Sequence, residues 1–91
     1  METFIVKNYI LNIHTNERYY VDFNYVTVTR LIAFQLIDAV LRCNGFGILI
    51  RHVESGRFRS VDPPFSPVSD LKRGEIIDKI LSDLVFFNPF R

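Results

Sequence analysis

The sequence predicts an α+β fold in which two β-hairpins and two helices follow one another in the order ββαββα. Segments 3–25 and 45–61 alternate apolar and polar residues with the two-residue period of strands, and each is interrupted by a turn. Segments 29–45 and 74–86 carry apolar residues at helical spacing. We expect an antiparallel sheet of about four strands, packed with both helices in a single compact domain spanning residues 1–91.

Composition and charge narrow the class of protein. Of the 91 residues, 48% are hydrophobic and 14% are aromatic, which is typical of a folded chain rather than a disordered one. A domain of this size has much surface for its volume, so this apolar fraction predicts apolar surface that a partner covers. The formal net charge of +1 excludes an acidic nucleic-acid mimic and a generally basic, non-specific nucleic-acid binder.

Cysteine content and hydropathy bear on location. The single cysteine, Cys43, allows neither an internal disulfide nor a cysteine metal site, and we expect it to be a small buried side chain in the last turn of the first helix. Residues 1–13 lack the basic start and unbroken apolar core of a signal peptide. No apolar run approaches the roughly 18–20 residues of a membrane span. We therefore expect a soluble, cytoplasmic protein that binds no membrane.

The first hairpin covers residues 3–25. A three-residue loop at 15–17 would place its apolar residues on one face and its mostly polar residues on the other, whereas a two-residue loop would scatter them. The predicted pairs are Ile13 with Tyr19, Leu11 with Val21, and Tyr9 with Phe23. We therefore expect an amphipathic hairpin that gives the sheet one face in contact with water.

The first helix is predicted from Thr29 to Gly45. Thr27 or Thr29 can cap its start, and Asn44 with Gly45 supplies a stop signal. Its polar residues occupy a strip only about 60° wide at 100° per residue. They are Gln35, Asp38 and Arg42. A helix that is apolar on its other sides must be flanked by the sheet, by the second helix or by another subunit.

The second hairpin follows at residues 45–61, with Ser55-Gly56 as a two-residue turn. This turn would pair Val53 with Phe58 and Arg51 with Ser60. One face would carry Leu49, Arg51, Val53 and Phe58. The other face would carry Ile48, Ile50, His52 and Arg59, with Glu54 pairing with Arg57 at the tip. Both faces are partly apolar, so we expect both to be covered near the base of the hairpin.

A proline-rich linker, 62–70, leads to the second helix. We predict this helix from Gly74 to Phe86, with the acidic Glu75 in its first turn. Its apolar stripe consists of Ile76, Ile77, Ile80, Leu81, Leu84 and Val85. The remaining positions are mostly polar, which is typical of a helix packed on one side.

Basic residues in and after the second hairpin form the first candidate binding site. They are Arg51, Arg57, Arg59, Lys72 and Arg73. Arginine binds phosphate and carboxylate groups in a bidentate manner, and Phe58 and Phe65 lie close enough in the sequence to stack on bases. Three roles remain open for this cluster: a solvated face, a contact with nucleic acid, or a contact with carboxylates of a protein partner.

The aromatic C-terminal segment, residues 86–91, is the second candidate. Phe86, Phe87 and Phe90 lie close together where chain ends are usually polar. They either fold back on the core or anchor a partner, because interface contacts favour aromatic residues.

Evidence for catalysis is weak in this sequence. His14 and His52 have no second metal ligand at a usable spacing, and the serines, Ser55 among them, lie near no obvious base in the sequence. A chain of this length leaves little room for a closed pocket. We therefore expect no catalytic residues, no metal, no cofactor and no enzyme activity. A small hydrolase or metal enzyme would have to use His14 or His52.

The sequence thus predicts a small, non-enzymatic protein-binding module, such as an assembly subunit, an adaptor or an inhibitor. Its partner would be a larger protein or a second copy of itself. The predicted partner-binding residues are Arg51, Arg57, Phe58, Arg59, Phe86, Phe87 and Phe90. The alternative is a nucleic-acid-binding module that uses Arg57, Arg59, Lys72 and Arg73.

Overall fold

A computed structural model describes residues 2–21, 25–43 and 45–86. Within these ranges the elements are β1 (Phe4–Leu11), β2 (Arg18–Tyr20), β3 (Val26–Val28), α1 (Arg30–Leu41), β4 (Gly47–His52), β5 (Phe58–Val61) and α2 (Asp70–Val85). The predicted α+β class is confirmed. The order differs by one strand, because the return strand of the first hairpin is divided into β2 and β3.

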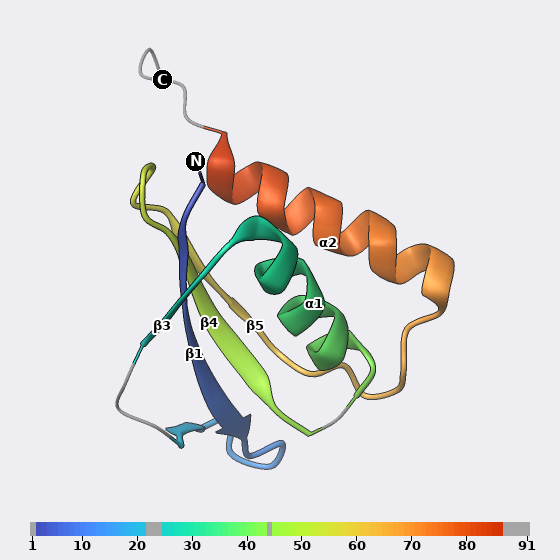
Figure 1. The fold of residues 1–91 in the computed structure, drawn as a ribbon. Coiled ribbons are helices and arrows are strands. Elements are labelled where there is room, and N and C mark those ends of the chain that lie inside the picture. The colour runs from blue at the N-terminus through green and yellow to red at the C-terminus, as the bar shows by residue number, and fades with distance from the viewer. Residues whose placement is uncertain (1, 22–24, 44, 87–91) are drawn as a thin grey trace.

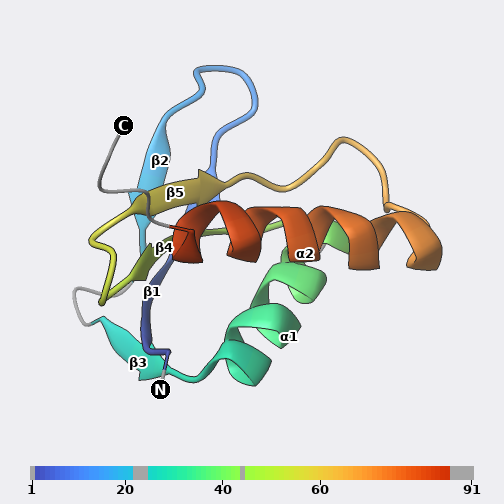
Figure 2. The same cartoon turned by 90° about the horizontal axis from the view of Figure 1, so that it is seen from above.

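The five strands of the described chain form an antiparallel sheet in the order β2-β1-β4-β5, and β3 also pairs with β1. Both helices lie on the same side of this sheet (Figures 1 and 2). α1 contacts β1, β3 and β4, and α2 packs on α1 and β4. In the described ranges neither helix is long and apolar enough to cross a lipid bilayer.

The core lies between the sheet and the two helices. Its strand residues are Phe4, Val6, Ile48, Ile50 and Val61, and its helix residues are Ala33, Ile37, Val40, Leu41, Ile77, Ile80, Leu81 and Leu84. Full burial of each large aliphatic side chain contributes about 1.5–3 kcal/mol to folding. The predicted apolar stripe of the second helix is confirmed, since four of its residues are buried and the other two pack at the margin of the core.

The helix boundaries differ from the prediction. α1 ends at Leu41, because the chain turns into left-handed backbone at Cys43 (φ 65°) and Gly45 (φ 84°). Cys43 is therefore outside the helix and half-buried, and its thiol donates to the Pro64 carbonyl at 3.1 Å. α2 begins at Asp70, after an extended Ser69, so Asp70 rather than Glu75 is the acidic residue of its first turn.

The predicted register of the first hairpin is wrong near its loop. Tyr9 pairs with Tyr20, and the connection runs from residue 12 to 17. Asn12 causes this longer loop: its side chain accepts hydrogen bonds from the backbone of His14 and Thr15, and its carbonyl accepts from Asn16. Tyr20 therefore takes the place predicted for Phe23 opposite Tyr9, and Tyr20 rather than Tyr19 lies on the Tyr9 face.

The same return strand recovers the predicted register further along. β3 pairs Phe4 with Val28 and Val6 with Val26. This is the same register as the predicted pair of Tyr9 with Phe23. Tyr20 and Val26 are six positions apart while their β1 partners, Tyr9 and Val6, are three apart, so the return strand contains an insertion of three residues. Residues 22–24, with the predicted Phe23, lie outside the described ranges.

The second hairpin keeps the predicted faces but not the predicted pairs. Arg51 pairs with Phe58, two residues out of the expected register, because the loop runs from 53 to 57. The His52 amide donates to the Arg57 carbonyl at 2.9 Å, and Gly56 adopts a φ of 74° inside the loop. A shift of two preserves the side on which each side chain lies.

Candidate binding site on the open face of the sheet

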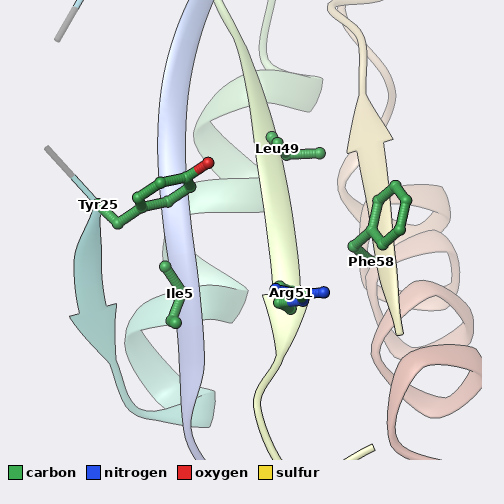
Figure 3. A pocket seen from close by; sticks show the side chains of 5 residues that line it. All are labelled: Ile5, Tyr25, Leu49, Arg51 and Phe58. Carbon is green, nitrogen blue, oxygen red and sulfur yellow. The ribbon is translucent and has the colours of Figure 1, made fainter. Parts of the chain in front are cut away.

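The side of the sheet that faces away from both helices is named here the open face. Phe4, Val6, Ile48 and Ile50 face the helices, so the residues that alternate with them face the other way. Ile5, Lys7, Tyr9, Tyr20, Leu49, Arg51 and Phe58 are therefore residues of the open face. In Figure 3, the labelled side chains stand in front of the strands and the helices lie behind.

One end of the open face is covered by the chain itself. Tyr9 is fully buried although no helix lies over it. Its ring meets Tyr20 edge-on at 5.6 Å between centroids, and the Arg18 guanidinium lies 5.6 Å from its centre. Gly47, opposite Tyr9 in β4, leaves the space the ring occupies, because a Cβ there would lie 2.6 Å from the Tyr9 hydroxyl oxygen.

A polar network closes this end. The Tyr9 hydroxyl donates to Asp62, and Arg18 binds the same carboxylate in a bidentate manner at 3.1 and 2.9 Å. Burial, followed by the hydrogen bond to Asp62, raises the pKa of Tyr9 above its usual value, so the phenol stays protonated at neutral pH. The hydrogen bond from Arg18 holds the pKa of Asp62 below its usual value. The network is therefore suited to holding strands together rather than to proton transfer.

The other end of the open face contains a hollow of about 310 Å³. Its lining residues are Ile5, Tyr25, Leu49, Arg51 and Phe58 (Figure 3). Phe58 and Tyr25 lie at opposite sides of the hollow, and they have 66% and 58% of their surface exposed, which is high for aromatic side chains. We name this hollow the sheet pocket.

Cations lie over the aromatic rings around the sheet pocket. The Lys7 ammonium lies 4.9 Å from the ring centroid of Tyr20 and 5.0 Å from that of Tyr25. The Arg51 guanidinium carbon lies 5.9 Å from the centroid of Phe58. These are cation–π distances, so this part of the surface is both apolar and positively charged.

Two of the predicted partner-binding residues, Arg51 and Phe58, meet in the sheet pocket. Arg59 pairs with Ile50 and is on the opposite side of the sheet. Arg57 lies in the hairpin loop, where it donates to the Phe86 carbonyl at 2.9 Å instead of pairing with Glu54. Phe86 is exposed at the end of α2, and Phe87 and Phe90 lie outside the described ranges.

The residues of the nucleic-acid alternative lie in separate elements: Lys72 and Arg73 in α2, Arg59 in β5 and Arg57 in the loop before β5. Arg73, in the first turns of α2, donates to Asp38, Asp70 and the Val68 carbonyl. Arg57 contacts the other end of the helix at Phe86. Thirteen residues of α-helix separate these ends by about 20 Å. The structure therefore brings Lys72 and Arg73 together, but not with Arg57.

Sequence reasoning missed a hydrogen-bonded group in the second hairpin loop. Ser55 Oγ lies 2.8 Å from His52 Nδ1, so the expectation that this serine lies near no base was wrong. The hydroxyl donates to the Leu84 carbonyl at 2.7 Å, and His52 Nδ1 accepts from the Ser55 amide. Because the serine proton is directed at a carbonyl, this group ties the loop to α2. The three-residue spacing of His52 and Ser55 across a turn was the available signal.

Glu54 also has a different role from the one predicted. Its carboxylate accepts hydrogen bonds from the Thr3 amide at 3.0 and 3.2 Å, and the same contact lowers the pKa of Glu54. It lies 3.2 Å from Nε2 of the buried His52, without the geometry of a hydrogen bond. Residues 2–21, 25–43 and 45–86 contain no group of three side chains that could hold a metal ion.

Ile5, Lys7 and Tyr25 are members of the site that were not predicted. The alternation of β1 could have placed Ile5 and Lys7 on the same side as Tyr9, whereas the position of Tyr25, directly before β3, depends on the register of β3 on β1. Compared with known proteins, the chain matches no family model, no curated protein and no solved structure.

Proposed function

We propose that this chain is a small, non-enzymatic protein-binding module and that the sheet pocket is its binding site. One observation carries the proposal: the helices cover a single face of the sheet, and the other face presents an apolar pocket with exposed aromatic side chains. Phenylalanine, tyrosine and arginine are enriched in protein interfaces, and all three line this pocket.

The proposal retains part of the binding surface expected from the sequence. Arg51 and Phe58 of the second hairpin belong to the pocket, and the exposed Phe86 extends the apolar surface of the molecule elsewhere. A module of this kind would act as an assembly subunit, an adaptor or an inhibitor of a larger protein in the cytoplasm.

Nucleic-acid binding has less support. A stacking platform requires free ring faces and several cations directed at phosphates. On the open face Lys7 is already placed over Tyr20 and Tyr25, and Arg18 is bound to Asp62. These contacts favour a protein partner.

A matched pair of phenylalanines tests the proposal. Phe58 is 66% exposed in the pocket, and Phe65 is 98% exposed in the proline-rich linker. The tagged protein and its Phe58→Ala and Phe65→Ala variants are used to capture partners from lysate of the source cell, with and without nuclease. We expect a stoichiometric protein that survives nuclease and binds wild type and Phe65→Ala but not Phe58→Ala. Equal capture by wild type and Phe58→Ala, or capture that disappears with nuclease, would contradict the proposal.

A further inference from the structure

Three arginines of the described residues, Arg51, Arg57 and Arg59, are not paired with a described carboxylate, and of these Arg51 lines the sheet pocket. Four arginines are each paired with a carboxylate: Arg18 with Asp62, Arg30 with Glu2, Arg42 with Asp38, and Arg73 with Asp38 and Asp70. Arg51 has no such partner among the described residues. Its guanidinium lies near the Phe58 ring, at 5.9 Å, and its other neighbours in the sheet pocket are apolar or aromatic.

This environment leaves the guanidinium able to bind a ligand. Arginine remains charged at every physiological pH, and its planar fork of N–H groups matches a carboxylate in a bidentate manner. An aromatic ring beside it restricts its movement, so less conformational entropy is lost when a ligand binds. Arg18 forms such a bidentate pair within the chain, with hydrogen bonds of 3.1 and 2.9 Å to the Asp62 carboxylate.

The charge around the sheet pocket is positive. Lys7 and Arg51 lie beside the pocket, and the nearest carboxylate of the network at the other end, Asp62, is neutralised by Arg18. None of the residues that line the pocket is acidic. A partner carboxylate brought to the pocket gains attraction from Arg51 and meets no acidic side chain among the residues that line it.

The size of the pocket limits what can enter it. A volume of about 310 Å³ is at the lower end of the roughly 300–1,000 Å³ typical of ligand pockets. The apolar parts of Ile5, Leu49 and Phe58 would contact one large apolar side chain, and Arg51 lies at their border. A large apolar side chain with a carboxylate next to it therefore matches both the apolar lining and the positive charge of Arg51.

We propose that the sheet pocket binds an acidic segment of a partner protein, in which one large apolar side chain enters the pocket and a neighbouring carboxylate pairs with Arg51. This inference rests on the proposed protein-binding function and specifies the chemistry of the partner.

Three blocked tripeptides test the inference: Asp-Phe-Asp, its neutral isostere Asn-Phe-Asn, and Lys-Phe-Lys. Each is added to isotope-labelled protein, and binding is followed by the NMR shifts of the residues that line the pocket. Dissociation constants on the order of 1 mM are expected for ligands of this size, so about 10 mM peptide suffices. We expect Asp-Phe-Asp to bind about two- to fivefold more tightly than Asn-Phe-Asn, because a solvent-exposed ion pair contributes modestly, and Lys-Phe-Lys to bind most weakly.

Two charge-matched variants locate the effect. Arg51→Gln and Arg59→Gln each remove one positive charge from the same hairpin, on opposite sides of the sheet. Arg51→Gln should lower the affinity for Asp-Phe-Asp to that for Asn-Phe-Asn and leave the neutral peptide unaffected. Arg59→Gln should change neither. The preference for the acidic peptide should also shrink as salt is raised.

The possible failures can be told apart. If acidic and neutral peptides bind the pocket equally well, the acidic partner is wrong and the protein-binding function stands. If no peptide shifts the pocket residues, the proposed function fails as well. Tighter binding of oligothymidylate at the same residues would replace the protein partner by nucleic acid. Pocket shifts that change on dilution of the protein alone would identify a second copy as the occupant.

Discussion

Gly47 is the residue on which the packing of the open face most directly depends. It lies opposite Tyr9 in the β1–β4 pair, and the missing side chain is what lets the tyrosine ring lie flat against the sheet. Glycine normally weakens a strand, and an aromatic cross-strand neighbour compensates for this by covering the exposed backbone. Tyr9 is consequently buried on a face that no helix covers.

Gly47→Ala should therefore destabilise the protein. The new methyl group would lie 2.6 Å from the Tyr9 hydroxyl oxygen, so the ring must move and its bond to Asp62 must change. Overpacking of this kind costs about 1–3 kcal/mol in the free energy of unfolding, which urea denaturation measures.

Gly74→Ala is the matched control. Gly74 lies inside α2, and a Cβ there would meet no atom within 4 Å. Replacing glycine by alanine in a helix stabilises by about 0.5–1 kcal/mol, so this variant should shift in the opposite direction. Equal effects of the two substitutions would show that Tyr9 does not depend on the space at Gly47.

At the scale of elements, the loop between β4 and β5 connects the sheet to the end of α2. Ser55 donates to the Leu84 carbonyl and Arg57 donates to the Phe86 carbonyl, two groups at the C-terminal end of the helix. The last carbonyls of a helix lack partners within the helix, and these side chains supply them. The loop thereby fixes the position of α2 over the sheet.

Ser55→Ala should loosen this connection. It removes the hydrogen bond to Leu84 and the acceptor for the Arg57 amide, at a cost of about 1–2 kcal/mol. Amide hydrogen exchange should become faster in the last turn of α2 and in the loop, with little change in β1. Ser66→Ala in the exposed linker is the control and should leave exchange unchanged. Uniform acceleration throughout the chain would show that Ser55 acts on global stability instead.

At the scale of the molecule, a single polar network bridges the sheet. Arg18 belongs to β2 at one edge, and Asp62 follows β5 at the other edge, with β1 and β4 between them. The hydrogen bond that the buried Tyr9 hydroxyl donates to Asp62 lies in the middle of this bridge. The two ends of the sheet order are thus joined across the open face, next to the pocket.

The bridge should make stability depend on pH. The folded-state pKa of Asp62 is below its usual value of 3.8. The contribution of Asp62 to the free energy of unfolding is therefore complete above pH 3.8 and is lost as the pH falls through the lower folded-state pKa. Asp62→Asn should therefore be less stable than wild type near pH 7, by about 1 kcal/mol, because a neutral amide weakens the hydrogen bonds from Arg18 and from Tyr9. Denaturation at pH 7 and pH 2 measures the difference, which should narrow in acid. A difference that stays constant with pH would contradict the lowered pKa.

The class of fold, the sides on which the residues of β4 and β5 lie, and the buried stripe of α2 could be predicted from the sequence. These properties have a local origin, because the periods of strands and helices are set by the backbone. The period of two placed Arg51 and Phe58 on one side and Arg59 on the other, even though the predicted pairing was shifted by two residues.

The strand register and the binding site depend on tertiary packing and could not be predicted from the sequence. The side chain of Asn12 selects a longer first loop, and the insertion before β3 restores the original alignment, so the pattern of apolar residues could not reveal either change. The sheet pocket combines Ile5, Tyr25 and Phe58 from segments far apart in the chain. Such a site exists because both helices pack on the same face of the sheet, a choice made by the burial of the whole core rather than by any segment alone.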